Sequence, residues 1–539
     1  MRSVIDILHA MTTEEKVGQI IHAPALEDDA QWPSNDERRL IEHYHIGGVR
    51  IYSRLPDPAF CREYTNALQR WALDTRMGLP LLVGIDGETG VDVVRTGTSI
   101  YPSATGIALQ SLDVAQEVSA QIGRESLAVG ISLNQRPVAD VNTNPDNPVI
   151  GLRSPGDNAN VVASQVEASI LGARNVSLIT CAKHFPGHGD TAFDSHAELN
   201  AIACSLEEME DVHLRPFARA IQAGVDTVMT AHVLVPCLDP EYPATLSNRI
   251  LTHLLRNQMG FRGVIITDSM GMAAIADHFS VPDATVQAVQ AGVDLVRTCR
   301  DFDGTVLAYE GLLREVQAGV LPMARLDDAA MRVLRLKESR DWFSRERLGT
   351  VENAVRVCHD PAARRLNRDV IRRSMAVVRN SDALPIRRGM TTLVTGPVST
   401  TALARSLLMQ GRPSLALEWL SASQADGWSP LPEEAARVQD LAGHSDTVIV
   451  LTFAQCGRLP EGQRALIEGL RSTGSRIVVV DLGFPRRPDS SWNTDGHIVT
   501  FAQARRPTEL SQPYIEVLTE VLVDEHPTVK PSTFRVSTV

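Results

Sequence analysis

The sequence predicts an α/β protein in which an N-terminal (β/α)8, TIM-like barrel is followed by a smaller three-layer α/β sandwich domain. The chain has 539 residues, which is too long for one ordinary hydrophobic core. In its N-terminal part, short apolar runs rich in β-branched residues alternate with longer amphipathic stretches. This alternation indicates a mostly parallel sheet, and the number of units fits a closed barrel better than a small open sheet.

The apolar runs of the N-terminal part are predicted to be the barrel strands. They are IGGVRIY (46–52), PLLVGID (80–86), ISLNQRPVADV (131–141), SLITCAKH (177–184), DTVMTAH (226–232), GVIITDS (263–269) and GVDLVRT (292–298). The segments between them carry apolar residues at helical spacing and end in glycine, as in SLEEMEDVHLRPFARAIQAG (205–224). Each unit of strand and helix therefore fits one step around a barrel.

A second pattern of helices and strands follows the barrel region. Its predicted elements are the helices LDDAAMRVLRLKESRDWF (326–343) and DPAARRLNRDVIRRSMAVVRN (360–380) and the strands within TTLVTGP (391–397), DTVIVLTF (446–453) and SRIVVVDLG (475–483). We therefore expect a barrel domain over residues 1–345, a helical linker over 346–384 and the sandwich domain over 385–539. The glycines of the sandwich region fit no nucleotide-binding fingerprint.

Composition and charge exclude several classes of partner. The net charge of −13 leaves no basic surplus for nucleic acid or an anionic membrane. The N-terminal segment MRSVIDILHAMTTEEKVGQI has acidic residues in its first turns and predicts a helix with a threonine cap, not a signal peptide. No apolar run approaches the roughly 18 residues of a membrane span. The seven cysteines form no CxxC pair, so we expect a cytoplasmic protein without structural zinc.

Polar residues gather at the ends of the predicted strands. These residues are Asp86, Asn142, Asn144, Lys183, His184, His232 and Asp268. In a barrel of this type the carboxyl ends of the strands form the active-site face, so these side chains are expected to converge on one pocket. A single buried polar residue is often only satisfied by the backbone. Several of them at the same end of successive strands favour a functional site.

The stretch KHFPGHGDTAFDSHAELN (183–200) is unusually rich in titratable groups. A metal site, a catalytic acid/base and a sugar-binding loop are three interpretations of it. The candidate metal ligands are His184, His188, Asp190, Asp194 and His196, which zinc would accept. A metal-dependent hydrolase on a barrel is therefore a rival enzyme class, but such sites usually include an HxH pair on a strand, which IGGVRIYSR and LLVGIDGE lack.

The segment KHFPGHGDTAFDSH closely resembles the signature of family 3 glycoside hydrolases, in particular their β-N-acetylglucosaminidase branch. MTTEEKVGQII, DVNTNPDNPVIGLRS, GVDTVMTAHVLVPCLDPEYPATLS and GFRGVIITDSMGM are similar to further family segments and occur in the family's order. The resemblance covers residues 5–340. It implies a retaining glycoside hydrolase that acts on a small-molecule glycoside without a cofactor or metal; the sequence makes no prediction of the oligomeric state.

The resemblance assigns three catalytic residues. Asp268, at the end of VIITD, matches the family's nucleophile, which forms a covalent glycosyl-enzyme intermediate. The acid/base is implied to be His196 paired with Asp194 in DSH, because a carboxylate orients a neutral imidazole and raises its pKa. The alternative interpretations are a helix N-cap for Asp268 and a simple turn for the DSH segment.

The resemblance also assigns substrate-binding residues. Asp86 matches a position that accepts hydrogen bonds from sugar hydroxyls, whereas Arg153, Lys183 and His184 match positions that donate them. His232 is expected either to line the pocket or to support it. His188 and Asp190 are expected to shape the loop.

The sequence departs from the family pattern near the expected pocket. DGETGVDVV (86–94) replaces the usual DQEGGRV, and NQRPV replaces NFAPV, so Gln135 and Arg136 stand for an aromatic and a small residue. These changes are expected to reshape the pocket mouth and to favour a polar aglycone. A specialised small-molecule glycoside is therefore an alternative substrate. A non-catalytic sugar-binding protein is a third hypothesis, although it would be expected to lack one of the three catalytic residues.

Overall fold

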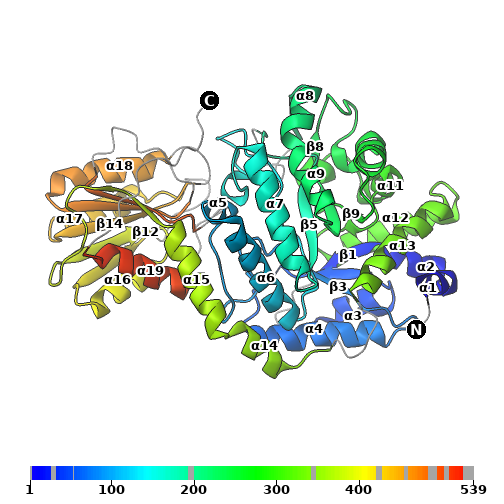
Figure 1. Cartoon of the computed structure of the whole chain (residues 1–539), viewed down its shortest axis with the longest axis horizontal. Coiled ribbons are helices and arrows are strands. Elements are labelled where there is room, and N and C mark those ends of the chain that lie inside the picture. Colours follow the sequence, from blue (N-terminus) through cyan, green and yellow to red (C-terminus); the bar gives the residue numbers. More distant parts are fainter. Residues whose placement is uncertain are drawn as a thin grey trace. The chain divides into compact units, whose positions relative to one another are not determined.

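The computed structural model describes residues 3–25, 32–52, 54–191, 199–340, 348–419, 428–454, 459–483, 494–502 and 509–525. The chain divides into two compact units (Figure 1). The first unit comprises Met1–Ser99, Ala115–Thr143 and Asn158–Ala363, and the second comprises Ile100–Val114, Asn144–Asp157 and Arg364–Val539. The domain ranges expected from the sequence stay a prediction.

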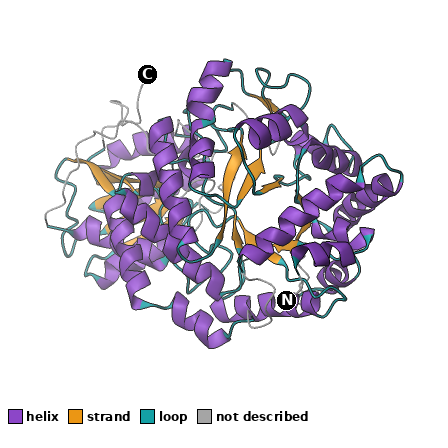
Figure 2. Cartoon of the chain, turned by 45° about the vertical axis from the view of Figure 1, so that its right-hand side comes forward, coloured by secondary structure: helices purple, strands orange, loops and turns teal. Residues whose placement is uncertain are grey.

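The first unit contains a barrel of parallel strands with helices around it (Figure 2). Its strands are β1 (Ile21–Pro24), β2 (Gly48–Arg50), β3 (Leu82–Ile85), β4 (Leu133–Asn134), β5 (Ile179–Phe185), β7 (Thr227–Thr230), β9 (Val264–Ile266) and β10 (Val296–Arg297). They pair in the order β10-β1-β2-β3-β4-β5-β7-β9. A parallel bridge between Ile266 and Leu295 links the two outer strands and closes the ring. The predicted barrel is therefore confirmed, although β1 was not among the predicted strands.

Helices precede the first strand of the barrel and lie along the chain between and after the other strands. They are α1 (Val4–Ala10), α2 (Thr13–Gln19), α3 (Asn35–Glu42), α4 (Pro58–Leu73), α6 (Leu112–Ala128), α7 (Ala159–Arg174), α8 (Leu206–Glu208), α9 (Arg215–Gln222), α10 (Ala273–Ala276), α11 (Val281–Ala291), α12 (Phe302–Gln317), α13 (Met323–Ser339) and α14 (Val351–Cys358), with π-helical turns at Met209–His213 and Arg249–Gln258. The predicted threonine cap is confirmed, because Thr12 caps α2 in a capping box with Glu15.

The barrel interior is a packed apolar core below its polar end. Inward-facing side chains from six of the strands or their edges form one buried cluster: Leu82, Leu133, Ile179, Cys181, Met229, Val264, Ile266 and Leu295. Val333 and Leu336 of α13 belong to the same cluster and so cover one end of the barrel. Space inside is tight, since a Cβ atom on Gly48 would lie 2.5 Å from the His22 ring.

Lys337 of α13 is a buried charged residue in this region. Its side chain is fully buried, and its ammonium group donates to Gln19 Oε1 at 2.7 Å. Burial lowers the pKa of Lys337 to about 7, whereas a lysine in the unfolded chain titrates at about 10.4. Between these two values the unfolded state binds more protons, so the free energy of unfolding rises with pH by at most about 1.4 kcal/mol per pH unit.

We expect Lys337→Met to raise the melting temperature, and to raise it more at pH 7 than at pH 10. At pH 7 folding of the wild type must bury an ammonium group or release its proton, and at pH 10 much less of this cost remains. Scanning calorimetry of both proteins at the two pH values measures the difference. An equal change at both pH values would show that Lys337 folds with an ordinary pKa.

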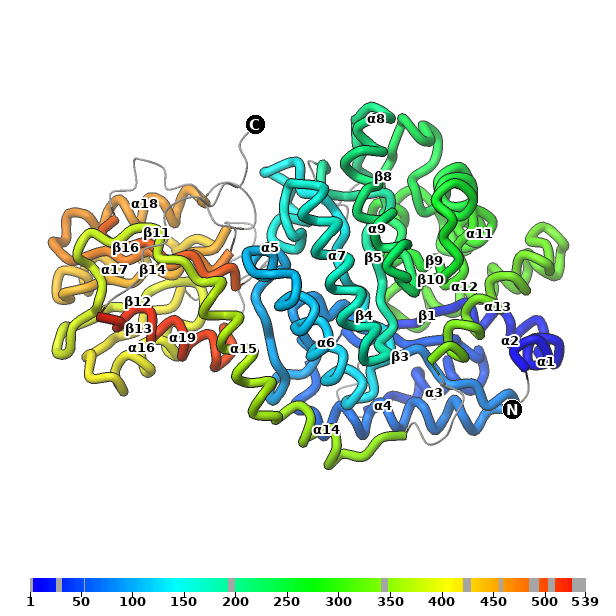
Figure 3. The backbone as a smooth tube through the Cα atoms, in the orientation of Figure 1, coloured from blue at the N-terminus to red at the C-terminus, as the bar shows by residue number. Residues whose placement is uncertain are grey.

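The second unit contains a three-layer sandwich (Figure 3). Its sheet has the strand order β11 (Ala376–Asn380), β16 (Gly496–Val499), β15 (Arg476–Asp481), β14 (Thr447–Thr452), β12 (Thr392–Gly396) and β13 (Ser414–Glu418), with β11 alone antiparallel to its neighbour among the strands described. The helices of this unit are α5 (Ala104–Ala108), α15 (Pro361–Ser374), α16 (Thr400–Met409), α17 (Pro432–Ala442), α18 (Glu461–Leu470) and α19 (Gln512–Val523).

Alternating residues of β14 show which helices cover each face of the sheet. Val448 and Val450 share a buried cluster with residues of α17 and α18. Ile449 and Leu451 share another with residues of α16 and α19. Successive side chains of a strand point to opposite faces, so the sheet lies between two helical layers. The predicted three-layer sandwich is confirmed.

One predicted helix is partly wrong. The segment 360–380 was expected to be helical throughout, but α15 ends at Ser374 and AVVRN (376–380) forms β11. This segment is rich in β-branched valine and pairs antiparallel with β16, which lies more than a hundred residues later in the chain. A distant partner of this kind outweighs the local helical pattern.

Candidate active site

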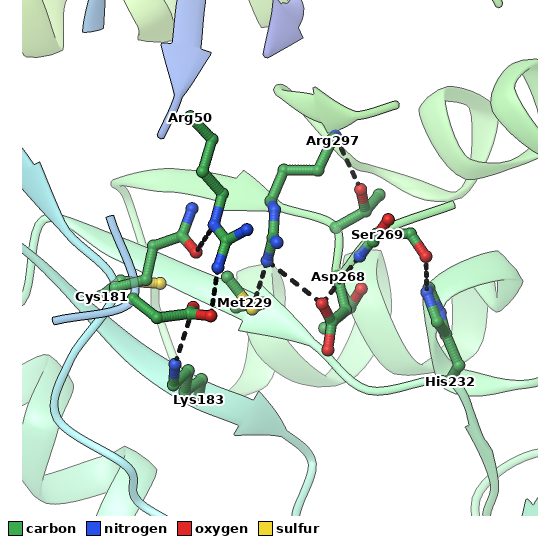
Figure 4. A network of polar contacts seen from close by, with 12 residues as sticks. Arg50, Cys181, Lys183, Met229, His232, Asp268, Ser269 and Arg297 are labelled. Carbon is green, nitrogen blue, oxygen red and sulfur yellow. Dashed lines mark hydrogen bonds and ion pairs between the residues drawn. The ribbon is translucent and has the colours of Figure 1, made fainter. Parts of the chain in front are cut away.

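The structure brings four of the predicted site residues to the same end of the barrel. Asp86 follows β3, Lys183 and His184 belong to β5, and Asp268 follows β9. These positions are at the carboxyl ends of parallel strands, where barrel active sites form. Figure 4 shows the polar network around Lys183 and Asp268.

Asp86 is held by two cations. Lys183 Nζ contacts Asp86 Oδ1 at 3.1 Å and Glu88 Oε1 at 2.7 Å, and the Arg50 guanidinium group forms a second ion pair with Asp86. Arg50 Nε also donates to Gln135 Oε1 at 3.2 Å. The side chain of Asp86 is 30% exposed, whereas those of Arg50 and Lys183 are 5% and 1% exposed. The carboxylate therefore faces solvent with its cations buried beside it.

Asp268 is an ionised carboxylate beside Arg297 of β10. Arg297 Nη1 donates to Asp268 Oδ1 at 3.1 Å. Burial alone would raise the pKa of Asp268, but the Arg297 guanidinium, followed by His184, lowers it well below its usual value. The next helix, α10, has Met272 as its N-cap, so the interpretation of Asp268 as a helix cap is wrong.

His232 uses both of its ring nitrogens within the protein. Nδ1 lies 2.8 Å from Thr245 Oγ1, and Nε2 lies 3.0 Å from the Ser269 carbonyl oxygen. Burial lowers the pKa of His232, so the ring is neutral and Nε2 donates to that carbonyl. This geometry favours the supporting role over direct substrate contact.

Asp140 anchors the start of the histidine-rich loop. This fully buried carboxylate accepts from the backbone nitrogens of His184 and His188 at 3.1 and 2.7 Å and contacts His184 Nδ1 at 2.8 Å. Burial would raise the pKa of Asp140, but His184 and His188 lower it, so the carboxylate stays charged. Asp140 therefore fixes the orientation of the His184 ring.

His188 and Asp190 occupy the loop-shaping positions expected of them. His188 Nδ1 lies 2.9 Å from Thr191 Oγ1, and Asp190 Oδ1 accepts from Thr143 Oγ1 at 2.9 Å. In both contacts the histidine or aspartate side chain is bonded to a threonine side chain of the chain itself. They join the loop to itself and to the segment that follows Val141.

The remaining predicted residues are divided between the two units or lie outside the described residues. Arg153 belongs to the second unit, where it is 2% exposed and its Nη1 donates to the Val149 carbonyl oxygen at 3.1 Å. Asn144 also belongs to the second unit, and Asn142 belongs to the first. Asp194 and His196 lie outside the described residues.

Several residues of this network were missed by the sequence analysis. They are Arg50, Tyr52, Glu88, Asp140 and Arg297. Arg50 and Arg297 stand out in the sequence as charged residues within the apolar runs IGGVRIY and GVDLVRT. Since barrel strands are buried on both faces, a charge within such a run is a signal of a polar site.

Gln135 and Arg136 directly follow the barrel strand β4, as the sequence predicted, but both side chains are buried. Gln135 is fully buried and bonded to Arg50, and Arg136 is 6% exposed. Their expected effect on the pocket mouth stays a prediction. Gln135 supports the Arg50–Asp86 pair.

The described part of the chain has neither a grouped metal site nor a membrane span. Among the residues that the structure describes, no three His, Cys, Asp or Glu side chains are grouped as metal ligands. Within the same residues, no helix has the length and apolar character needed to cross a membrane.

Comparisons with known proteins point to one family. Residues 12–336 match the model of the glycosyl hydrolase family 3 N terminal domain. Beta-hexosaminidase A of Pseudoalteromonas piscicida is 32% identical over 374 residues, which are 65% of this chain and 62% of that protein. A beta-N-acetylglucosaminidase/beta-glucosidase of Cellulomonas fimi is 29% identical over 398 residues, 71% of this chain and 67% of that protein.

A solved structure is similar over nearly the whole chain. A glycoside hydrolase family 3 β-N-acetylglucosaminidase from Paenibacillus sp. str. FPU-7 superposes with a TM-score of 0.83 at 30% identity. The superposition covers 95% of this chain and 97% of that one. Both compact units therefore have counterparts in a single relative.

Proposed function

Because the chain belongs to family 3 of the glycoside hydrolases, we propose that it is a β-N-acetylglucosaminidase that hydrolyses a terminal β-linked sugar with retention of configuration. The observation that carries this proposal is the ionised carboxylate of Asp268 at the carboxyl end of a barrel strand, beside Arg297 and His232. The relatives named above supply the identity of the sugar.

The first chemical step is attack of the Asp268 carboxylate on the anomeric carbon. The bond from that carbon to the aglycone oxygen breaks, and the oxygen takes a proton from His196, which Asp194 orients. The second step reverses the roles: His196 removes a proton from water, the water oxygen bonds to the anomeric carbon, and Asp268 leaves. Two inversions at one carbon give overall retention.

Asp86 accepts hydrogen bonds from hydroxyl groups of the terminal sugar. Its carboxylate is the most exposed of the four acids in the network, and Lys183 and Arg50 hold it in one orientation. His184, held by Asp140, lies close enough to Asp268 to lower its pKa. These groups supply directional polar contacts that distinguish one sugar stereochemistry from another.

We expect aryl β-N-acetylglucosaminides to be the best substrates in a panel of aryl β-glycosides that differ at C2 and C4. Proton NMR of the first product should show the β-anomer, as retention requires. Treatment with EDTA should leave the rate unchanged.

Other outcomes of this panel favour the other hypotheses. Loss of activity with EDTA and its recovery with zinc would support a metal-dependent hydrolase. Sugar binding by calorimetry without turnover of any glycoside would support a non-catalytic binding protein. Preference for a glycoside without the N-acetyl group would support a specialised substrate.

A further inference from the structure

The two carboxylate oxygens of Asp268 have different surroundings. Oδ1 accepts from Arg297 Nη1 at 3.1 Å and from the Ser269 backbone nitrogen at 2.7 Å. Within the part of the chain that the structure describes, Oδ2 accepts no hydrogen bond. The side chain of Asp268 is 19% exposed, while that of Arg297 is 5% exposed. Oδ1 is therefore held by donors on the buried side of the carboxylate, and Oδ2 is not.

Arg297 is itself held in place by several contacts. Its Nη2 donates to the Tyr52 hydroxyl oxygen at 3.2 Å, and its backbone nitrogen donates to Thr267 Oγ1 at 2.9 Å. The Tyr52 ring packs against the Arg50 guanidinium group, whose central carbon lies 3.7 Å from the ring centroid. The guanidinium group of Arg297 points toward Asp268 in Figure 4. A charged donor with so little freedom fixes the rotamer of its acceptor.

We propose that Arg297 is a positioning residue which holds Oδ1 of Asp268, so that Oδ2 is the oxygen that bonds to the sugar, and which speeds release of the sugar from the intermediate. This inference rests on the proposed function, because it assumes that Asp268 is the nucleophile. It goes beyond that function in two ways. It identifies the oxygen of Asp268 that bonds to the sugar, and it identifies Arg297 as a residue that affects formation and hydrolysis of the intermediate in opposite directions.

The effect on the two steps follows from charge. When Oδ2 bonds to the anomeric carbon, the carboxylate becomes a neutral ester and the buried Arg297 loses its counter-ion. A buried charge without a partner is costly. When water displaces the sugar, the electron pair of the C1–Oδ2 bond returns to Asp268 and the ion pair forms again. Arg297 therefore disfavours the ester and shortens its lifetime.

The test compares Arg297→Gln and Arg297→Lys with the wild type. Each protein is loaded with a 5-fluoro-N-acetylglucosaminyl fluoride, and the decay of the labelled protein is followed by intact mass. We expect Arg297→Gln to lengthen the lifetime about tenfold or more and to lower kcat and KM together for an activated aryl substrate. Arg297→Lys should restore part of the wild-type rate. In the pH profile of kcat/KM, the acid limb should move to higher pH in Arg297→Gln, because loss of the cation raises the pKa of Asp268.

Arg256→Gln is the matched control. Arg256 forms a buried ion pair with Asp294, which lies two residues before β10. Its loss should lower stability without changing the lifetime or the pH profile. If Arg297→Gln does not fold, Tyr52→Phe removes one acceptor of Arg297 and should lengthen the lifetime to a smaller degree.

Two outcomes would overturn the inference. An unchanged lifetime in both Arg297→Gln and Arg297→Lys, or in Tyr52→Phe where the glutamine variant is lost, would show that Arg297 has only a structural role. A shorter lifetime would show that the cation stabilises the ester. If the label forms on no variant and not on the wild type, the proposed nucleophile fails, and this result is distinct from a change in lifetime.

Discussion

Asp268→Ala should lower kcat/KM for every glycoside by a factor on the order of 10⁴ or more. Without this carboxylate no glycosyl-enzyme intermediate forms, and alanine offers no other nucleophile in the same place. Steady-state kinetics with an activated aryl N-acetylglucosaminide measure the loss. The variant leaves the buried Arg297 without its carboxylate partner, so its stability should fall, although Arg297 keeps its contact with Tyr52.

Asp277→Ala is the control for this variant. Asp277 is an exposed aspartate nine residues further along the chain, at the end of α10, and its loss should leave the rate unchanged. A small anion such as azide should partly restore bond cleavage in Asp268→Ala by attack from the vacated side, which gives the α-glycosyl azide. A strong residual rate without azide would contradict the role of Asp268.

His196→Ala should slow substrates with poor leaving groups by about 10² to 10⁴, and nitrophenyl glycosides far less. A poor leaving group needs its proton in the transition state, whereas an activated phenolate leaves without it. A series of aryl glycosides with leaving groups of graded pKa measures this dependence. Asp194→Ala should show a weaker form of the same pattern, because it removes only the group that orients the imidazole.

The control for the histidine variant is His253→Ala, which removes an exposed histidine of the same barrel unit. It should change neither class of substrate. Equal losses for good and poor leaving groups in His196→Ala would mean that the loop only positions the substrate. In that case the acid/base must be sought among other residues.

The strands that the sequence predicted are those with long β-branched runs. β1 has only the four residues of IHAP directly after α2, which is too short for a periodic signal. AVVRN became a strand because its partner, β16, lies far away in the chain. Pairing at such distances cannot be derived from local periodicity.

The site residues differ in the same way: some can be predicted from their own segment, and others only from the pairing of distant strands. Four site residues were predicted because each lies at the end of an apolar run whose composition indicates a strand. They are Asp86, Lys183, His184 and Asp268. Arg50 and Arg297 were missed because strands of two or three residues give no inward or outward periodicity. Their direction follows only from the register, in which β1 joins β2 and β10.

The link between Asp140 and His184 illustrates the limit most clearly. The two residues are 44 positions apart, on the segment after β4 and within β5. Each is an ordinary polar residue in its own segment. Only the parallel pairing of those segments brings the carboxylate to both the imidazole and the backbone of the loop.

The most direct test of the central claim is covalent labelling of the wild type. The protein is treated with a 5-fluoro-N-acetylglucosaminyl fluoride, digested, and mapped by tandem mass spectrometry. A single label on Asp268, one sugar per chain, is the result that the mechanism predicts. A label on another residue, or rapid hydrolysis of N-acetylglucosaminides by Asp268→Ala, would contradict it.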